Sequence, residues 1–241
     1  TAALPLAKLD NLNTDEAKIG SVDSTVNILD AITLLSKIKK NYKCKRFVYL
    51  SSSMVYGDFK TNKVNEKSPV NPKEAYGTMK LAGEIVTRGI SKLNNIPYTI
   101  IRPSAVYGPT DMNRRVSQIF IESAFTGKQI EIEGKNEKLD FTYIEDLAKG
   151  CVLAGTKDKG INQIFNITYG KAQTLYSFVI NLKKIFPNLI FKIKPRDITK
   201  PSRGTLSINK AKKLLNFNPK HNLKIGIKKY VQYLIDNKIY K

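Results

Sequence analysis

The chain has 241 residues, 41% of them hydrophobic and 25% charged, with a formal net charge of +21 at pH 7. These proportions are ordinary for a globular protein with a sizeable core, and no apolar run approaches the roughly 18 residues of a membrane-spanning helix. The single His, His221, argues against a His-based metal site or a Ser-His-Asp triad, and Cys44 and Cys151 lack metal-ligand spacing and fit a reducing cytoplasm.

The first part of the chain alternates between helices and apolar strands. A helix is predicted over about residues 15–40, where Val22, Val26 and Leu29 recur at helical spacing. The apolar run 46–50 indicates a buried strand, and a helix over 72–94 and a strand over 97–102 follow it. This alternation predicts an α/β fold, a doubly wound parallel sheet with helices on both faces.

The second part is expected to form a smaller region. We place residues 1–108 in the sheet domain and 109–241 mainly in a second domain. Residues 139–168 are expected to return to the sheet, with a strand at 163–167, and an amphipathic helix is predicted near 223–239.

Hydroxyl, phenol and ammonium groups are expected together at one end of the sheet. The segment 51–57, Ser-Ser-Ser-Met-Val-Tyr-Gly, directly follows the strand 46–50. Ligands bind at the carboxyl ends of strands in open α/β sheets. Tyr-x-x-x-Lys pairs occur at Tyr76/Lys80 and at Tyr56/Lys60. Two such pairs are no more than composition allows by chance, and an exposed helix face is the ordinary explanation of one of them.

Local structure separates the two pairs. Asn71, Pro72 and Glu74 suit the N-cap, N1 and N3 positions of a helix, so Tyr76 and Lys80 would lie one turn apart on one face. Tyr56 and Lys60 straddle the turn signal Gly57-Asp58. We therefore select Tyr76 and Lys80.

This trio suits proton transfer at a carbinol group. A free phenol, with a pKa of about 10, is a poor base at neutral pH. A neighbouring ammonium stabilises the phenolate and is expected to lower the pKa of Tyr76. A Ser hydroxyl would orient the substrate oxygen as its proton leaves.

Four ordered motifs resemble the extended short-chain dehydrogenase/reductase family, specifically its nucleotide-sugar epimerases and dehydratases. Two are the Ser-Ser-x-x-x-Tyr-Gly and Tyr-x-x-x-Lys motifs already described. The third is Arg-Pro-x-x-x-Tyr-Gly-Pro at 102–109, and the fourth is Asp-Phe-Thr-Tyr-Ile-Glu-Asp at 140–146. The end of the chain, 203–219, is similar to the family's substrate-domain tail. The resemblance runs from residue 1 to about residue 235 and implies a Rossmann-type domain.

The resemblance also implies roles for individual residues. The catalytic residues would be Ser52, Tyr76 and Lys80. NAD, with NADP not excluded, would be bound by Ala2, Ala3, Ser51, Tyr76, Lys80 and Pro103. A nucleotide-diphosphate sugar would be bound by Ser53, Ala105, Arg115 and Arg203, with Arg114 as a weaker candidate. No metal is implied, and the implied assembly is a homodimer.

Departures from the family pattern narrow the activity. The 4,6-dehydratases carry Thr-Asp-Glu where this chain has Ser52, Ser53 and Met54. Neither Ser53 nor Met54 can replace that acid pair at its ordinary pKa, so dehydratase activity is disfavoured. Ala105 replaces a frequent Asn, and Leu139 replaces a frequent Arg that binds a substrate phosphate.

The Gly-rich turn of the family has no counterpart in this sequence. No Gly-x-x-Gly-x-x-Gly follows any predicted strand, and the chain starts at Thr1 without Met. We expect a fragment of a longer enzyme, with the strand 46–50 as an open apolar edge. Such an edge favours aggregation, so the 241 residues alone are expected to be poorly soluble and not to bind NAD measurably.

The expected activity is NAD-dependent 4-epimerisation of a nucleotide sugar through a 4-keto intermediate. The alternative is a nucleotide-sugar dehydrogenase or 4-ketosugar reductase using the same residues. A remote alternative is nucleic-acid binding, which the charge of +21 suggests. Lys residues spread along the chain, with few Arg residues for base contacts, argue against it.

Overall fold

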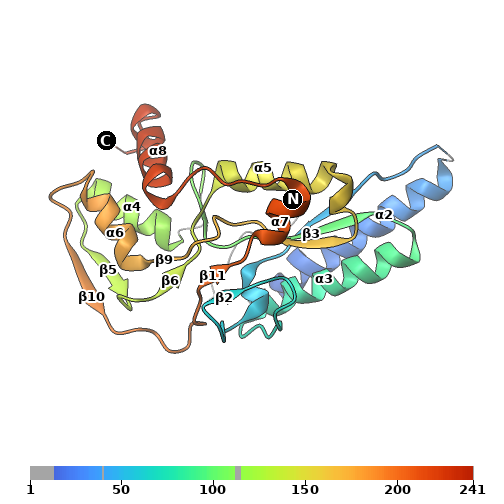
Figure 1. The fold of residues 1–241 in the computed structure, drawn as a ribbon, viewed down its shortest axis with the longest axis horizontal. Coiled ribbons are helices and arrows are strands. Elements are labelled where there is room, and N and C mark those ends of the chain that lie inside the picture. Colours follow the sequence, from blue (N-terminus) through green and yellow to red (C-terminus); the bar gives the residue numbers. More distant parts are fainter. Residues whose placement is uncertain (1–13, 40, 112–114, 241) are drawn as a thin grey trace.

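A three-stranded parallel sheet forms the centre of the first part of the molecule (Figure 1). The computed structural model describes residues 14–39, 41–111 and 115–240. Strands β1 (Phe47–Leu50), β3 (Tyr98–Arg102) and β8 (Gln163–Asn166) lie in the order β1-β3-β8. Val48 pairs with Thr99, and Ile100 pairs with Ile164. The predicted α/β fold with a parallel sheet is confirmed.

Helices cover both faces of this sheet (Figure 1). Helix α5 (Ile144–Thr156) packs on one face, and α2 (Ser24–Ile38) and α3 (Ala75–Leu93) lie on the other. The helix expected over 15–40 is observed as α1 (Thr14–Lys18), a π-helical turn (Ile19–Asp23) and α2. Among the described residues, β1 has a strand partner on one side only, as expected for an edge; the poor solubility stays a prediction.

The predicted start of the α3 helix is wrong. The N-cap is Glu74 in an extended conformation, without a side-chain cap hydrogen bond, instead of Asn71. Residues 71 and 72 pack on the turn at Gly57, where a Cβ atom would lie 1.9 Å from the Asn71 carbonyl oxygen. Residues 71 and 72 therefore pack against another segment of the chain and do not form the helix start that local capping rules predict. Tyr76 and Lys80 still lie one turn apart on α3.

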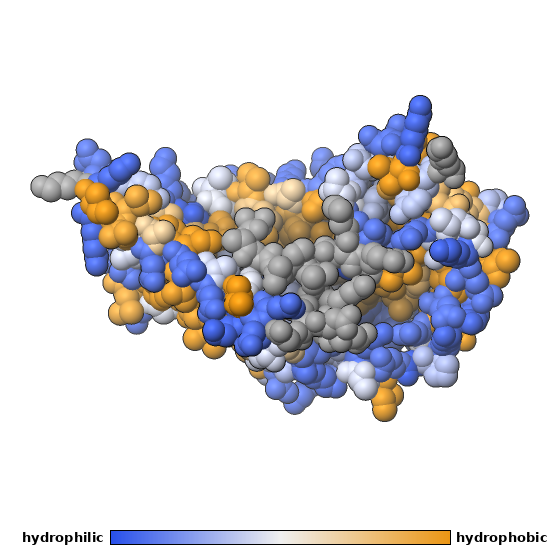
Figure 2. All heavy atoms as spheres, turned by 180° about the vertical axis from the view of Figure 1, so that it is seen from behind, coloured by the Kyte–Doolittle hydropathy of each residue, from blue (hydrophilic) through white to orange (hydrophobic). Residues whose placement is uncertain are grey.

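A second group of elements encloses a separate core. Strands β5 (Ile130–Glu133) and β10 (Phe191–Lys194) pair in parallel. Helices α4 (Val116–Thr126), α6 (Leu175–Lys183) and α8 (Leu223–Asp236) surround them (Figure 1). Phe120, Phe178 and Ile227 lie in this core. The face in Figure 2 carries hydrophilic residues on both halves of the molecule, with hydrophobic groups among them.

The C-terminal part returns to the sheet more often than we expected. Helix α7 (Asn209–Leu215) contacts β8, and Ile208 and Phe217 share a buried core with Ile101 and Phe165. Residues after 168 thus contribute to both parts of the molecule. The apolar side chains of this segment cover the sheet edge at β8. The domain boundary at residue 108 remains a prediction.

Short elements connect these layers. A 3-10 turn follows β1 at Ser53–Tyr56, and another lies at Asp158–Gly160. The remaining strands form three two-stranded pairs: β2 (Lys63–Val64) with β11 (Thr205–Leu206), β4 (Val106–Tyr107) with β7 (Thr142–Tyr143), and β6 (Lys138–Leu139) with β9 (Gln173–Thr174).

Candidate active site

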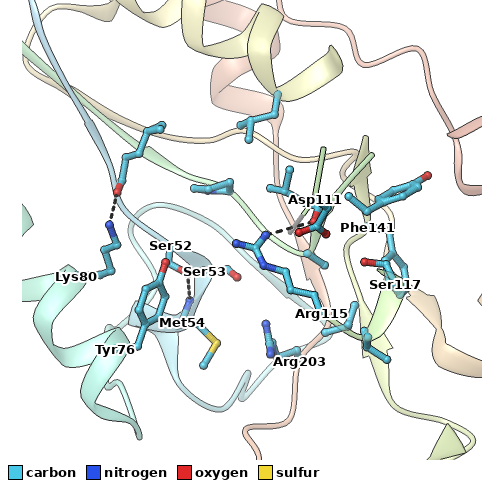
Figure 3. Close-up of a pocket in the computed structure, with 18 of the residues that line it drawn as sticks. Ser52, Ser53, Met54, Tyr76, Lys80, Asp111, Arg115, Ser117, Phe141 and Arg203 are labelled. Atoms are coloured by element: carbon cyan, nitrogen blue, oxygen red, sulfur yellow. Dashed lines mark hydrogen bonds between the residues drawn. The ribbon is translucent and has the colours of Figure 1, made fainter. Parts of the chain in front are cut away.

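A cavity of about 1040 Å³ lies beyond the carboxyl ends of β1 and β3 (Figure 3). It extends along β1 and α2 on one side and reaches β5 on the other. The predicted site residues that line it are Ser51, Ser52, Ser53, Tyr76, Lys80, Pro103, Ala105, Arg115 and Arg203. Ala2, Ala3 and Arg114 lie outside the described residues. The structure therefore brings together every predicted site residue that it describes.

Ser52 and Tyr76 meet at one end of this cavity (Figure 3). The Ser52 hydroxyl caps the 3-10 turn, accepting a hydrogen bond from the Met54 amide at 3.2 Å, and it lies beside the Tyr76 hydroxyl. Burial raises the pKa of Tyr76, although the Arg115 charge and the Ser52 hydroxyl oppose this rise. We expected a lowered pKa, and in this structure burial outweighs the polar neighbours.

Lys80 is buried beneath Tyr76. Its ammonium donates to the Leu50 carbonyl at 3.0 Å and lies 5.7 Å from the centroid of the Tyr76 ring. The side chain also contacts the Tyr49 ring, at 5.4 Å. Burial lowers the pKa of Lys80 to about 8. A strand carbonyl therefore fixes the ammonium on the side of Tyr76 that faces the sheet.

The alternative Tyr–Lys pair does not face the cavity. Tyr56 is 2% exposed, donates to the Asn166 side-chain oxygen at 2.8 Å and accepts from Arg102 at 3.0 Å. Lys60 is exposed. Tyr56 therefore holds the core together, and the geometry separates the two pairs in the same way as the local sequence did.

A buried ionic network supports the cavity floor, and sequence reasoning missed it. Arg102 makes two hydrogen bonds to Glu84, at 2.8 and 2.7 Å. Ser51 donates to the same carboxylate at 2.5 Å. The Ser51 hydroxyl is therefore already engaged, and the Ser51 amide donates to the Ile101 carbonyl at 2.8 Å, which leaves the Ser51 carbonyl for a ligand. Glu84 lies one turn after Lys80, and a charged residue on the buried face of α3 was the available signal.

The backbone beside Pro103 is held in an unusual conformation. The Pro103 carbonyl accepts a hydrogen bond from the Ser53 amide at 2.8 Å, which joins the 3-10 turn to the end of β3. Two residues later, Ala105 has φ +39°, in the left-handed region that favours Gly and Asn. The turn contributes Ser53 to the cavity lining, and the segment after β3 contributes Ala105; both side chains are small.

The two arginines predicted from the sequence line another part of the cavity (Figure 3). Arg115 donates to the Val106 carbonyl at 3.3 Å and points toward Asp111. Arg203 is half-buried, its charge faces Glu74 and Glu137, and burial lowers its pKa. Sequence reasoning did not identify the other charged lining residues, Glu74, Asp111, Glu131, Glu133, Glu137, Arg196, Asp197 and Lys200. Tertiary folding brings them to the cavity from separate segments.

The described part of the chain holds no group of three or more His, Cys, Asp or Glu residues that could bind a metal ion. None of the helices described is long and apolar enough to cross a membrane.

Comparison with known proteins places this arrangement among related sequences. Residues 10–168 match the model of the NAD dependent epimerase/dehydratase family. A putative UDP-glucose 4-epimerase of Methanocaldococcus jannaschii is 32% identical over 222 residues, which cover 89% of this chain and 71% of that protein. An uncharacterised UDP-glucose epimerase of Bacillus subtilis is 29% identical over 208 residues, covering 86% of this chain and 66% of that protein. The chain thus spans about two thirds of the length of these relatives.

Solved structures give the same result. UDP-glucuronic acid 4-epimerase from Bacillus cereus, in complex with UDP-glucuronic acid and NAD, superposes with a TM-score of 0.81 at 27% identity, covering 92% of this chain and 68% of that one. UDP-glucose 4-epimerase from Thermotoga maritima, with UDP-glucose, superposes with a TM-score of 0.85 at 26% identity, covering 99% and 76%.

Proposed function

Since this chain belongs to the NAD-dependent epimerase/dehydratase family, we propose that it carries the catalytic residues of a nucleotide-sugar 4-epimerase. The convergence of Ser52, Tyr76 and Lys80 at one end of the cavity is the observation that carries this proposal. Relatives named as UDP-glucose and UDP-glucuronate 4-epimerases support the substrate class, a nucleotide-diphosphate sugar.

Tyr76 would exchange the proton of the sugar 4-hydroxyl. The phenolic oxygen lies beside the Ser52 hydroxyl, which would hold the same substrate oxygen. Lys80 would stabilise the phenolate by its charge, since its ammonium remains close to the ring. The 4-keto sugar would then turn over, so that C4 regains its hydrogen on the opposite face while Tyr76 returns the proton to the 4-oxygen, and the 4-epimer is formed.

The described residues fit NAD as the cofactor. The cavity continues from Tyr76 along β1 to α2, where Gly20 and Ser24 line it and leave room for a ligand to approach the backbone. Lys80, Tyr76, Pro103 and the Ser51 backbone would contact the cofactor. When bound, NAD supplies hydride acceptance and return at C4. The proposed contacts of Ala2 and Ala3 lie outside the described residues, and NADP remains an alternative.

The nucleotide end would be bound by basic side chains. Arg203 and Arg115 line the cavity away from Lys80, and their guanidinium groups suit phosphate oxygens. Ser53 and Ala105 would contact the sugar. Ser53 and Met54, both buried, offer no acid pair for elimination, which disfavours a 4,6-dehydratase.

Product analysis separates this function from its alternative. Full-length protein is incubated with UDP-glucose or UDP-glucuronic acid and catalytic NAD, and products are resolved by ion-pair chromatography while absorbance at the NADH band is followed. We expect the 4-epimer to accumulate in excess over the NAD present. Turnover limited to the amount of added cofactor would instead identify a dehydrogenase or ketosugar reductase.

The proposal also covers the oligomeric state and the cellular location of the protein. Leu35 and Ile85 are exposed hydrophobic side chains on α2 and α3, and they support a homodimer through this pair of helices. Sedimentation velocity measures the assembly directly, and a monomer at micromolar concentration would contradict it. The free Cys44 and Cys151 support a reducing, cytoplasmic location.

A further inference from the structure

One segment, residues 195–204, runs between the two parts of the molecule (Figure 1), and several of its residues line the cavity. We call this segment the strap. It leaves β10, which pairs with β5, and ends at β11, which pairs with β2. Its second half is anchored at Ser202, which donates to Asp58 at 2.7 Å and accepts from the Phe59 amide at 2.8 Å. The strap contributes three basic side chains to the cavity lining: Arg196, Lys200 and Arg203.

The wall opposite the strap is acidic. The residues between 130 and 139 that line the cavity are Glu131, Glu133, Glu137 and Leu139. Glu131 and Glu133 occupy the outward positions of β5, and Ile130 and Ile132 point into the core. Because these lining residues include no cation, a polyanionic ligand at this wall depends on the strap for positive charge.

Exposed ion pairs connect the strap to this wall. The Lys200 ammonium lies 2.7 Å from Glu133, and Arg196 Nε lies 2.9 Å from Glu137. These side chains retain between 27% and 54% of their exposure. Ion pairs so open to solvent contribute little stability, so the two cations can exchange partners at little cost.

Arg203 differs from the other two cations. None of the hydrogen bonds found among the described residues involves its guanidinium, and the carboxylates that act on its charge are Glu74 and Glu137. Glu137 therefore faces both Arg196 and Arg203. The Glu137 carboxylate therefore competes with an anionic ligand for the guanidinium groups of Arg196 and Arg203.

We propose that Arg196 and Lys200 join Arg203 in binding the substrate diphosphate, and that Glu137 and Glu133 are the partners they leave when it binds. This inference rests on the proposed function, since it requires a nucleotide-diphosphate ligand. Phosphate oxygens offer Arg196 a bidentate, charge-assisted contact that the Glu137 pair does not saturate. Glu137 is then a competitor of the diphosphate, and its neutralisation tightens binding.

Calorimetric titration with UDP and with UMP tests this exchange at one fixed, low salt concentration. Arg196→Ala is expected to weaken UDP binding about tenfold and Lys200→Ala by about threefold to tenfold, because each removes a charged hydrogen-bond donor. Glu137→Gln is expected to tighten it. All three effects should be smaller for UMP, which has one phosphate fewer.

Lys192→Ala is the matched control. Lys192 pairs with Glu131 at 2.7 Å and is 48% exposed, close to the 54% of Lys200, but it does not line the cavity. UDP affinity should be unchanged in this variant. If Lys192→Ala and Lys200→Ala weakened UDP binding equally, the effect would come from the overall charge of the protein and not from a contact of Lys200. If Glu137→Gln weakened UDP binding, the proposed exchange of partners would be wrong. Absence of UDP binding by the unmodified chain contradicts the proposed function itself, whereas normal binding by Arg196→Ala and Lys200→Ala contradicts only the role of the strap.

Discussion

The ammonium of Lys80 lies 5.7 Å from the centroid of the Tyr76 ring and is fixed there by a hydrogen bond to the Leu50 carbonyl at 3.0 Å. Leu50 is the last residue of β1, so the strand itself positions the cation. The same strand end continues into Ser52, whose hydroxyl lies beside that of Tyr76 (Figure 3). One strand end and one helical turn thus define the geometry of the proposed proton transfer.

Removing the phenol of Tyr76 should abolish turnover without unfolding the protein. General acid–base catalysis typically contributes about 10²–10⁴-fold, so we expect kcat of Tyr76→Phe to fall by this factor. The affinity for UDP-glucose should stay nearly unchanged, because the phenol acts mainly in the transition state. Steady-state kinetics and calorimetry measure the two quantities separately.

Tyr56→Phe serves as the counterpart of that variant. It removes the hydroxyl that bonds Arg102 and Asn166 in the core, so it should lower the free energy of unfolding by about 1–3 kcal/mol. Turnover of the folded fraction should persist. If Tyr56→Phe reduced kcat more than Tyr76→Phe, the choice between the two Tyr–Lys pairs would be wrong.

Neutralising Glu84 should destabilise the fold strongly. Glu84 is 1% exposed and receives bonds from Arg102 and Ser51, so Glu84→Gln leaves a buried guanidinium without its counter-charge. Breaking a buried pair in this way typically costs about 3–5 kcal/mol. Urea denaturation should show a much lower midpoint. Glu131→Gln, at an exposed pair with Lys192, should leave the midpoint almost unchanged.

Lys80 should make stability depend on pH in a defined window. Its pKa is about 8 in the folded protein and near 10.5 when unfolded, so the unfolded chain binds more protons between these values. Stability from this group is therefore lowest below pH 8 and rises toward pH 10.5. Lys80→Met should be more stable than the unmodified chain at pH 7, with a gap that narrows by pH 9. A gap independent of pH would show that Lys80 keeps its ordinary pKa.

Turnover should follow the opposite trend. The charged ammonium is the form that stabilises the Tyr76 phenolate, and it is lost as pH rises through about 8. We therefore expect kcat to fall above this pH. Initial rates from pH 6.5 to 9.5 at saturating substrate measure the descending limb, and a flat profile over this range would contradict the proposed role of Lys80.

Ala105→Gly should stabilise the protein. Ala105 has φ +39°, a conformation that costs a non-Gly residue about 1–3 kcal/mol, while Gly adds up to about 1 kcal/mol of chain entropy. A net gain of up to about 2 kcal/mol is expected as a higher melting temperature. Ala148→Gly, at an exposed interior position of α5, should instead lose about 1 kcal/mol. Destabilisation by both substitutions would show that Ala105 is not strained.

Several elements of this protein could be predicted from local sequence pattern. Apolar runs and helical spacing predicted β1, β3, β8, α2 and α8, because the spacing of apolar residues along a segment indicates which of its faces is buried. The spacing of Tyr76 and Lys80 gave their common face, because a helix brings residues four apart together whatever surrounds it. The order of the motifs identified the family.

Contacts between residues far apart in the sequence became known only from the folded structure. Asn71 loses its capping role because Gly57 packs against it, and the Ser51 hydroxyl turns to Glu84 because that carboxylate is buried with Arg102. The ion pairs between the strap and Glu133 and Glu137 join two segments that lie about 60 residues apart in the sequence. Such contacts have no local signature, since burial and charge pairing are set by the whole packed chain rather than by neighbours in sequence.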